Sequence, residues 1–173
     1  SIEYLKRISV IGAALSVEDR KMDINWGAEH ADISLELVPS GIRASFDLAT
    51  DFRTFKPELI GEAHYDRIKQ TIDISTRFKN LITHKLADRF EVFDVLQPLD
   101  AIFSGEIRAR VGLEGRVERA EFELKSASGS IRIPGIDAPP ITFRKITAEG
   151  HLGRTPDQLH ITNLSAEFAD ATA

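Results

Sequence analysis

Histidines are the first side chains in this sequence to consider for acid–base or metal chemistry. The five are His30, His64, His84, His151 and His160. None lies three to five residues from another, the spacing typical of a local zinc-binding pair. His151 and His160 could face each other across a hairpin that turns near Pro156. We interpret this pair as solvated strand histidines and predict no metal site.

Two groups of charged residues offer further candidates. Glu62, His64 and Asp66 alternate along one expected strand and would place a base beside an acid. Such alternation is also typical of the solvated face of a strand, and we favour that interpretation. Residues 18–23 hold three carboxylates, but two cations interrupt them and the spacing of a calcium-binding loop is missing. We therefore expect a polar hairpin tip there.

Signatures of the common enzyme classes are missing from the sequence. It contains no G-x-S-x-G elbow, no G-x-x-x-x-G-K-[ST] phosphate loop, no G-x-G-x-x-G and no H-E-x-x-H. It also contains no cysteine, which excludes thiolate zinc sites and cysteine nucleophiles. We predict a protein that is not an enzyme, with no catalytic residue and no cofactor.

The overall charge limits the classes of partner. Lys and Arg number 22 and Asp and Glu number 27 among 173 residues, so the formal net charge is −5. A dedicated nucleic-acid binder needs a basic surface, so we predict no nucleic-acid partner. No apolar run approaches the roughly 20 residues that span a bilayer. The chain begins directly in a patterned segment at Ser1, and we expect it to be part of a longer protein.

Apolar and polar residues alternate along most of the chain, which is the pattern of half-buried strands. The clearest stretches are residues 33–37, 42–48, 107–113, 120–125 and 164–168. Turn-forming groups such as Pro39-Ser40-Gly41 separate them. Together these features predict about ten strands in an antiparallel meander.

One segment has a helical period instead. Phe78, Ile82, Leu86 and Phe90 recur every four residues, and neither glycine nor proline occurs from 78 to 97. The pattern predicts an amphipathic helix from about Lys79 to Phe93.

These elements predict a mainly β fold: a long antiparallel meander forming a curled, groove-like or sandwich sheet with one short amphipathic helix. We expect a single domain over residues 1–173, with a first strand set at 1–78, the helix and a linker at 79–97, and a second strand set at 98–173. One short helix covers only part of such a sheet. The remaining apolar face must close on itself, pack on a second sheet, or hold a non-protein ligand.

Phenylalanines at alternating positions indicate what this apolar face could do. An ordinary sandwich core is one interpretation, and a hydrophobic groove for acyl chains is the sharper one. The candidate lipid-facing residues are Phe46, Leu48, Ile107, Val111, Phe122, Leu124, Phe143 and Phe168. On the opposite side, Arg108, Arg110, Glu121 and Glu123 should face water.

The order of several short phrases resembles the YhdP/TamB-type repeat region of the AsmA-like superfamily. In chain order they are LKRI to AALSVED (5–19), NW (25–26), LADRF (86–90), QPL (97–99), GSIRIP (129–134), TAEG (147–150) and QLHITNL (158–164). Between Leu99 and Gly105 this chain has an insertion relative to the family pattern. The phrases extend over nearly the whole chain, and their order is what makes the similarity.

The resemblance implies part of a large bacterial envelope protein, anchored in the inner membrane and extending through the periplasm. Such proteins resemble bridge-like carriers, in which the concave apolar face of a long curled sheet shields phospholipid acyl chains between the inner and outer membranes. The family implies no catalytic residue. The alternative is a structural or assembly scaffold of the envelope without lipid cargo, for example a closed sandwich.

A slice of a longer sheet would also have exposed edges. We expect at least one unpaired edge strand near Ile2–Val17 or Leu159–Ala169. Because unpaired edges invite further strands, edge-to-edge self-association is expected as well.

Overall fold

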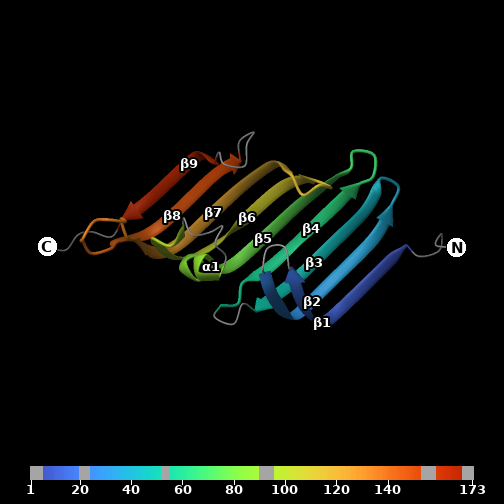
Figure 1. Cartoon of the computed structure of the whole chain (residues 1–173), viewed down its shortest axis with the longest axis horizontal. Coiled ribbons are helices and arrows are strands. Elements are labelled where there is room, and N and C mark those ends of the chain that lie inside the picture. The colour runs from blue at the N-terminus through green and yellow to red at the C-terminus, as the bar shows by residue number, and fades with distance from the viewer. Residues whose placement is uncertain (1–5, 20–23, 52–54, 90–95, 153–158, 169–173) are drawn as a thin grey trace.

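The computed structural model describes residues 6–19, 24–51, 55–89, 96–152 and 159–168, which form one sheet and one helix (Figure 1). The strands are β1 (Arg7–Asp19), β2 (Ile24–Val38), β3 (Gly41–Asp51), β4 (Glu58–Asp66), β5 (Thr71–Ile82), β6 (Leu99–Gly112), β7 (Val117–Ile131), β8 (Ile141–Leu152) and β9 (Leu159–Phe168), and the helix is α1 (Thr83–Arg89).

Every strand of the sheet pairs antiparallel with its neighbours in the sequence, in the order β1 to β9. The mainly β antiparallel fold with one short helix is confirmed, with nine described strands rather than about ten. β5 and β6, on either side of α1, pair directly, so the two expected strand sets belong to one continuous sheet. The described residues contain this one sheet and not the two facing sheets of a sandwich.

The helix is shorter than the sequence predicted. The expected range began near Lys79, but β5 continues to Ile82 and α1 begins at Thr83. Asn80 has a left-handed φ of 59° and lies within a bulge of β5, after which the next pair joins β5 to β6 again. The apolar residues that recur every four positions therefore lie partly at the end of β5 and partly in α1. Residues 90–93 of the expected helix lie outside the described residues.

The register divides the sheet into two chemically different faces, because directly paired residues point to the same side. One row of paired positions crosses all nine strands as Val10, Ile33, Phe46, Gly61, Thr76, Ile107, Phe122, Gly150 and Ile161. We call the side bearing this row the apolar face. A row on the opposite side includes Asp32, Asp47, Ile60, Arg77, Glu106, Glu123 and Glu149. We call that side the charged face.

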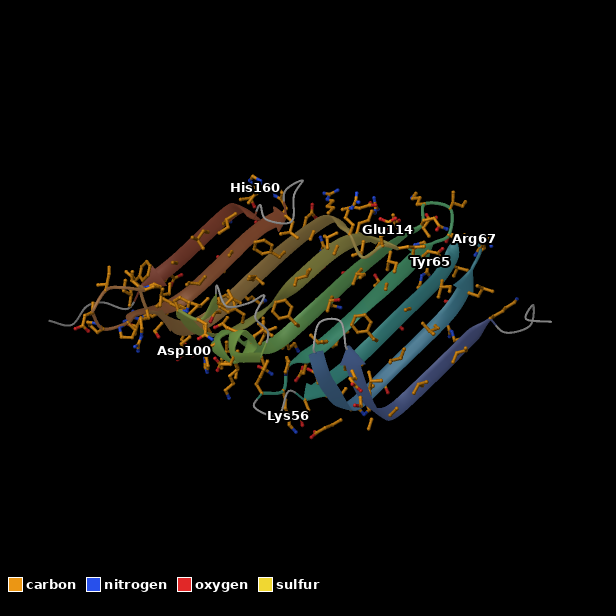
Figure 2. The ribbon with its side chains drawn as sticks, viewed as in Figure 1. Lys56, Tyr65, Arg67, Asp100, Glu114 and His160 are labelled. Atoms are coloured by element: carbon orange, nitrogen blue, oxygen red, sulfur yellow. The ribbon has the colours of Figure 1, made fainter. Side chains whose placement is uncertain are left out.

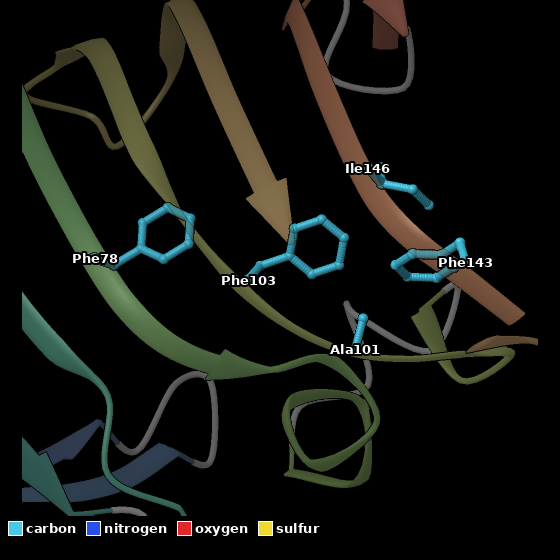
Figure 3. Packing of buried hydrophobic residues seen from close by; sticks show 5 residues of the cluster. All are labelled: Phe78, Ala101, Phe103, Phe143 and Ile146. Atoms are coloured by element: carbon cyan, nitrogen blue, oxygen red, sulfur yellow. The ribbon is translucent and has the colours of Figure 1, made fainter. Parts of the chain in front are cut away.

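The main core lies at one end of the apolar face, where α1 contacts β5 and β6. Phe78, Phe103, Phe143 and Ile146 are buried together there with Ala101 (Figure 3). A smaller cluster of Ala28, Ala31 and Leu48 lies on β2 and β3.

The start of α1 is tied to β6 by a buried hydroxyl group. Thr83 Oγ1 donates a hydrogen bond to the carbonyl oxygen of Leu99 over 2.5 Å, and the backbone N of Ala101 lies 3.3 Å from the same hydroxyl. This contact holds the helix against the end of the sheet. Among the described residues, no helix has the length and apolar character needed to cross a membrane.

Candidate functional site on the apolar face

The register places all eight predicted lipid-facing residues on the apolar face. They are Phe46, Leu48, Ile107, Val111, Phe122, Leu124, Phe143 and Phe168. The four residues expected to face water, Arg108, Arg110, Glu121 and Glu123, lie on the charged face. Alternation was thus sufficient to assign the side of regularly paired residues, whereas the side of Phe143 relative to Ile146 depends on a bulge in β8.

These eight residues do not line one common pocket. Phe143 is 2% exposed and Leu48 is also buried, so both belong to the packed clusters. Ile107 is 42% and Phe168 is 55% exposed. The other four are partly buried. The apolar face is therefore packed in these two clusters and more open between and beyond them.

The apolar face bears no charge from β2 to β9. Outside the bulges, its described positions hold no Asp, Glu, Lys or Arg. Two of its few hydroxyl groups bond to nearby backbone: Thr50 to the carbonyl of Pro57 over 2.6 Å and Ser126 to that of Ser128 over 2.9 Å. Exposed apolar patches of more than a few hundred Å² are typical of binding surfaces. Figure 2 shows side chains along the strands of this sheet.

Four phenylalanines of this face lie directly across from glycines on the adjacent strand. The pairs are Phe46 with Gly61, Phe78 with Gly105, Phe143 with Gly129, and Phe122 with Gly150. A Cβ added at Gly61 would lie 2.6 Å from Cζ of Phe46, and one at Gly150 would lie 2.5 Å from Cζ of Phe122. Each ring therefore extends sideways over its glycine. The result is a low apolar surface built from large side chains.

The glycine partners were missed in the sequence analysis. Alternation identified Phe46 and Phe122, but a cross-strand neighbour depends on register, which is not visible within a single strand. Glycine inside a strand was the available signal, because it often marks the close approach of another group.

A second row across the middle strands consists of four alanines and one isoleucine. Ala44, Ala63, Ile74, Ala109 and Ala120 are paired in succession from β3 to β7. Two residues further along the strands, about 6.7 Å away, larger side chains follow on both sides. They include Phe46 and Phe122 on one side and Ile42, Tyr65 and Val111 on the other. On β3, β6 and β7 the apolar face is thus lower at Ala44, Ala109 and Ala120 than beside them, whereas Ile74 interrupts the row on β5.

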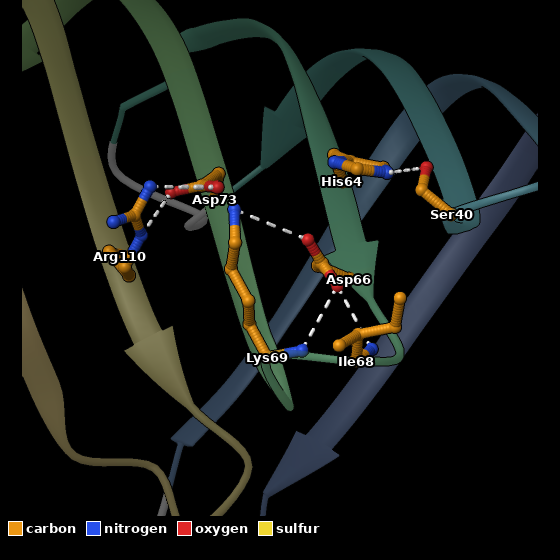
Figure 4. A network of polar contacts seen from close by, with 7 residues as sticks. All are labelled: Ser40, His64, Asp66, Ile68, Lys69, Asp73 and Arg110. Atoms are coloured by element: carbon orange, nitrogen blue, oxygen red, sulfur yellow. Dashed lines mark hydrogen bonds and ion pairs between the residues drawn. The ribbon is translucent and has the colours of Figure 1, made fainter.

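The charged face consists of ion pairs between and along strands. Arg110 forms a two-point contact with Asp73, with Nε–Oδ1 and Nη2–Oδ2 distances of 2.7 and 3.2 Å, and this contact raises the pKa of Arg110 (Figure 4). The hydrogen bond from Arg119 lowers the pKa of Glu121. An open hollow of about 590 Å³ on this face includes Arg110, Arg119 and Glu121 among its lining residues. Cations and carboxylates line it together, which is typical of a solvated face.

In the possible acid–base set Glu62, His64 and Asp66, the last two residues make contacts that stabilise turns. His64 Nε2 lies 2.9 Å from the hydroxyl of Ser40. One carboxylate oxygen of Asp66 accepts hydrogen bonds from the backbone N–H groups of residues 68 and 69 over 2.9 and 3.0 Å, and these lower the pKa of Asp66 (Figure 4). His64 and Asp66 therefore hold neighbouring turns, and the geometry contains no bond between them.

His151 and His160 do face each other, as the sequence suggested. Their rings stack across β8 and β9 with centroids 5.1 Å apart and an interplanar angle of 14°. Among the described residues, no group of three His, Asp or Glu side chains is arranged to hold a metal ion. Of the expected polar tip at 18–23, residues 20–23 lie outside the described part of the chain.

The strongest candidate for function is consequently a surface, the open part of the apolar face, and not a cluster of reactive groups. Its defining properties are the absence of charge, the exposure of large aliphatic side chains and the low profile of its phenylalanine–glycine pairs. Comparison with protein-family models, curated proteins and solved structures finds no match to this chain.

Proposed function

We propose that this chain is a non-enzymatic module whose apolar face shields the acyl chains of phospholipids. The observation that supports this is a charge-free face continuous across the sheet, on which residues such as Leu35, Leu37, Ile42 and Ile107 remain exposed. Each methylene group removed from water gains about 0.8 kcal/mol. An acyl chain lying on this face would therefore be held without any specific polar contact.

The shape of the face suits a cargo that moves. The phenylalanine rings lie over glycines, and alanines on β3, β4, β6 and β7 keep much of the face low beside larger side chains. A surface without polar anchors discriminates little between positions along an acyl chain. Lipids would be retained by their apolar area while their headgroups stay in water.

The wider setting follows from the resemblance to the AsmA-like superfamily. We propose that the chain belongs to an inner-membrane-anchored periplasmic protein that moves phospholipid between the inner and outer membranes. A meander whose terminal strands β1 and β9 each have one paired side is compatible with a place in a longer sheet. The rival proposal is an envelope scaffold, in which the same face packs against protein.

Two isoleucines provide a matched test of the lipid proposal. Ile107 on the apolar face and Ile60 on the charged face are 42% and 39% exposed, and both lie on central strands. In Ile107→Glu, a carboxylate would lie where acyl chains should run, at a cost of several kcal/mol if it remains unpaired. In Ile60→Glu, the carboxylate would lie directly across from Arg77 in solvent.

The measurement is lipid content by native mass spectrometry and by extraction after detergent-free purification, with folding checked by circular dichroism. We expect phospholipid on the wild type and on Ile60→Glu, and its loss from folded Ile107→Glu. A folded wild type that never contains lipid would favour the scaffold. Equal lipid content in both variants would contradict binding on the apolar face.

A further inference from the structure

The apolar face differs between the two ends of its strands. The turns that join β2 to β3, β4 to β5 and β6 to β7 lie along one margin of the sheet, which we call the turn end (Figure 1). Near these turns, Leu37, Ile42 and Val117 are 57%, 42% and 38% exposed. Further along β3 and β5, Leu48 and Phe78 are only 7% and 5% exposed. Large apolar side chains are therefore accessible from the turn end up to the row in which both buried clusters begin.

The length of this open part is close to that of the acyl part of a phospholipid. On β6 it runs from Val111 to Gly105, and the next residue of the face, Phe103, is buried. The strand extends about 20 Å between Val111 and Gly105. The acyl chains of one bilayer leaflet occupy about 15 Å, half of the hydrocarbon thickness. A phospholipid lying along the strands therefore fits between the turn end and the buried clusters.

The turn between β4 and β5 presents an isoleucine between two cations. Ile68 is 84% exposed, with Arg67 before it and Lys69 after it. The carboxylate of Asp66 accepts two backbone hydrogen bonds within this turn. Gln70 has a left-handed φ of 58° and donates its backbone N–H to the carbonyl oxygen of Asp66 over 2.9 Å. The exposure of Ile68 therefore follows from the geometry of a hydrogen-bonded turn.

Three cations at the turn end can reach an anionic group. They are Arg67, Lys69 and, on the turn between β6 and β7, Arg116. Within the described part of the chain, the side chains of Arg67 and Arg116 form no hydrogen bond or ion pair. Lys69 Nζ lies 3.4 Å from Asp66 Oδ2 and its side chain is 64% exposed. Segments 67–70 and 113–116 contain one carboxylate, Glu114, which Figure 2 shows at the same margin as Arg67. Cations beside an open apolar surface suit a ligand with an anionic group at the end of apolar chains.

We propose that a phospholipid lies along the strands of the apolar face, with its phosphate among Arg67, Lys69 and Arg116 and its acyl chains directed toward the buried clusters. This orientation rests on the proposed lipid-shielding function and adds a preference for anionic headgroups. The two turns that carry the cations are neighbours on one margin, about 10 Å apart, because two strand spacings separate them. A phosphate can therefore pass from one turn to the next while the acyl chains stay on the face.

Two photoreactive phospholipids test the orientation on the wild type. One has a diazirine at the end of an acyl chain and the other has it on the headgroup; each is loaded from vesicles without detergent, and cross-linked residues are identified by mass spectrometry. We expect the acyl label near Leu48 and Phe78 and the headgroup label within 67–70 or 113–116. Reversed labelling, or equal labelling of both ends by each probe, would overturn the orientation but leave lipid binding on the face intact. No label on the apolar face would overturn the proposed function as well.

Charge reversal tests the three cations. Arg67→Glu combined with Arg116→Glu should lower the amount of bound phosphatidylglycerol, an anionic lipid, at least about fivefold, and that of zwitterionic phosphatidylcholine less. The control combines Lys125→Glu with Arg132→Glu, which makes the same change in net charge at two exposed residues further from the turn end. Bound lipid is extracted and quantified after incubation with vesicles of each lipid, and circular dichroism confirms folding. No fall in the first double variant, or an equal fall in the control, would contradict the phosphate site.

Discussion

Similar apolar side chains are buried at one end of the apolar face and exposed at the other. Near α1, Phe78, Phe103 and Phe143 are buried in a packed cluster. Away from the helix, residues of the same face such as Leu37 and Ile42 are 57% and 42% exposed. The end near α1 holds the larger buried cluster, and the other end leaves apolar side chains exposed. Substitutions at the two ends should therefore have separable effects.

The largest expected difference is between two directly paired phenylalanines, Phe143 and Phe168. Phe143 is only 2% exposed, so Phe143→Ala removes a buried ring. This should lower the free energy of unfolding by about 3–5 kcal/mol. Phe168→Ala, at a site 55% exposed, should cost less than about 1 kcal/mol. Urea denaturation followed by circular dichroism measures both. Similar losses would mean that the exposed Phe168 ring contributes to the core as much as its buried partner does.

Glycine substitutions sharpen the same comparison at the scale of one methyl group. Gly61→Ala would place a Cβ against the Phe46 ring and the backbone of β5, and should cost about 1–3 kcal/mol. Gly112→Ala is the control, because its nearest neighbouring atom would be 3.6 Å away.

A double variant tests whether the ring is responsible. If the Phe46 ring accounts for much of the lost stability, Gly61→Ala should lower the free energy of unfolding less in the Phe46→Ala variant than in the wild type. Equal stability of Gly61→Ala and Gly112→Ala in urea titration would contradict the sideways placement of the ring.

The contact that fixes the helix should have a smaller effect. Thr83→Val keeps the shape of the side chain but removes the hydroxyl that bonds to the carbonyl of Leu99. We expect a loss of about 1–2 kcal/mol, because the partly buried carbonyl of Leu99 loses the hydroxyl donor. Hydrogen exchange should then increase first in α1 and at the adjacent end of β6. Uniformly faster exchange throughout the sheet would indicate that α1 does not unfold separately from the strands.

The smallest expected effect lies at the turn between β4 and β5, far from α1. Backbone N–H groups of Lys69 and Ile68 lower the pKa of Asp66 below its usual value of 3.8. A lowered pKa means that the carboxylate stabilises the fold above pH 3.8, and that this contribution is lost as the pH falls through the lower folded value. In Asp66→Asn, the free energy of unfolding should therefore depend less on pH in acid than it does in the wild type. An unchanged acid profile in urea titrations would show that the turn is insensitive to this charge.

Local patterns predicted the faces of the sheet and its terminal strands, but not which residues pair across strands. Alternation at 107–111 correctly put Ile107 and Arg108 on opposite sides because the side-chain period of a strand is fixed by its backbone. The helix start was misplaced because Phe78 fits a strand row and a helical stripe equally well, and pairing with Gly105 decides between them.

The choice between a sandwich and a single open sheet was not available from the sequence, since both have the same alternation. The phenylalanine–glycine pairs required the register, and the register depends on bulges such as those in β1 and at Thr162. Irregular residues of this kind have weak sequence signals because their positions are determined by the pairing of two strands.

The nearest-neighbour order of the strands has a consequence for how the sheet can assemble. Because each described strand pairs only with the strands before and after it in the chain, no pairing has to wait for a distant segment. Contacts between close sequence neighbours favour rapid formation, and stability in such linear arrays is approximately a sum over units and their interfaces. The sheet can therefore grow hairpin by hairpin in the order in which the chain becomes available.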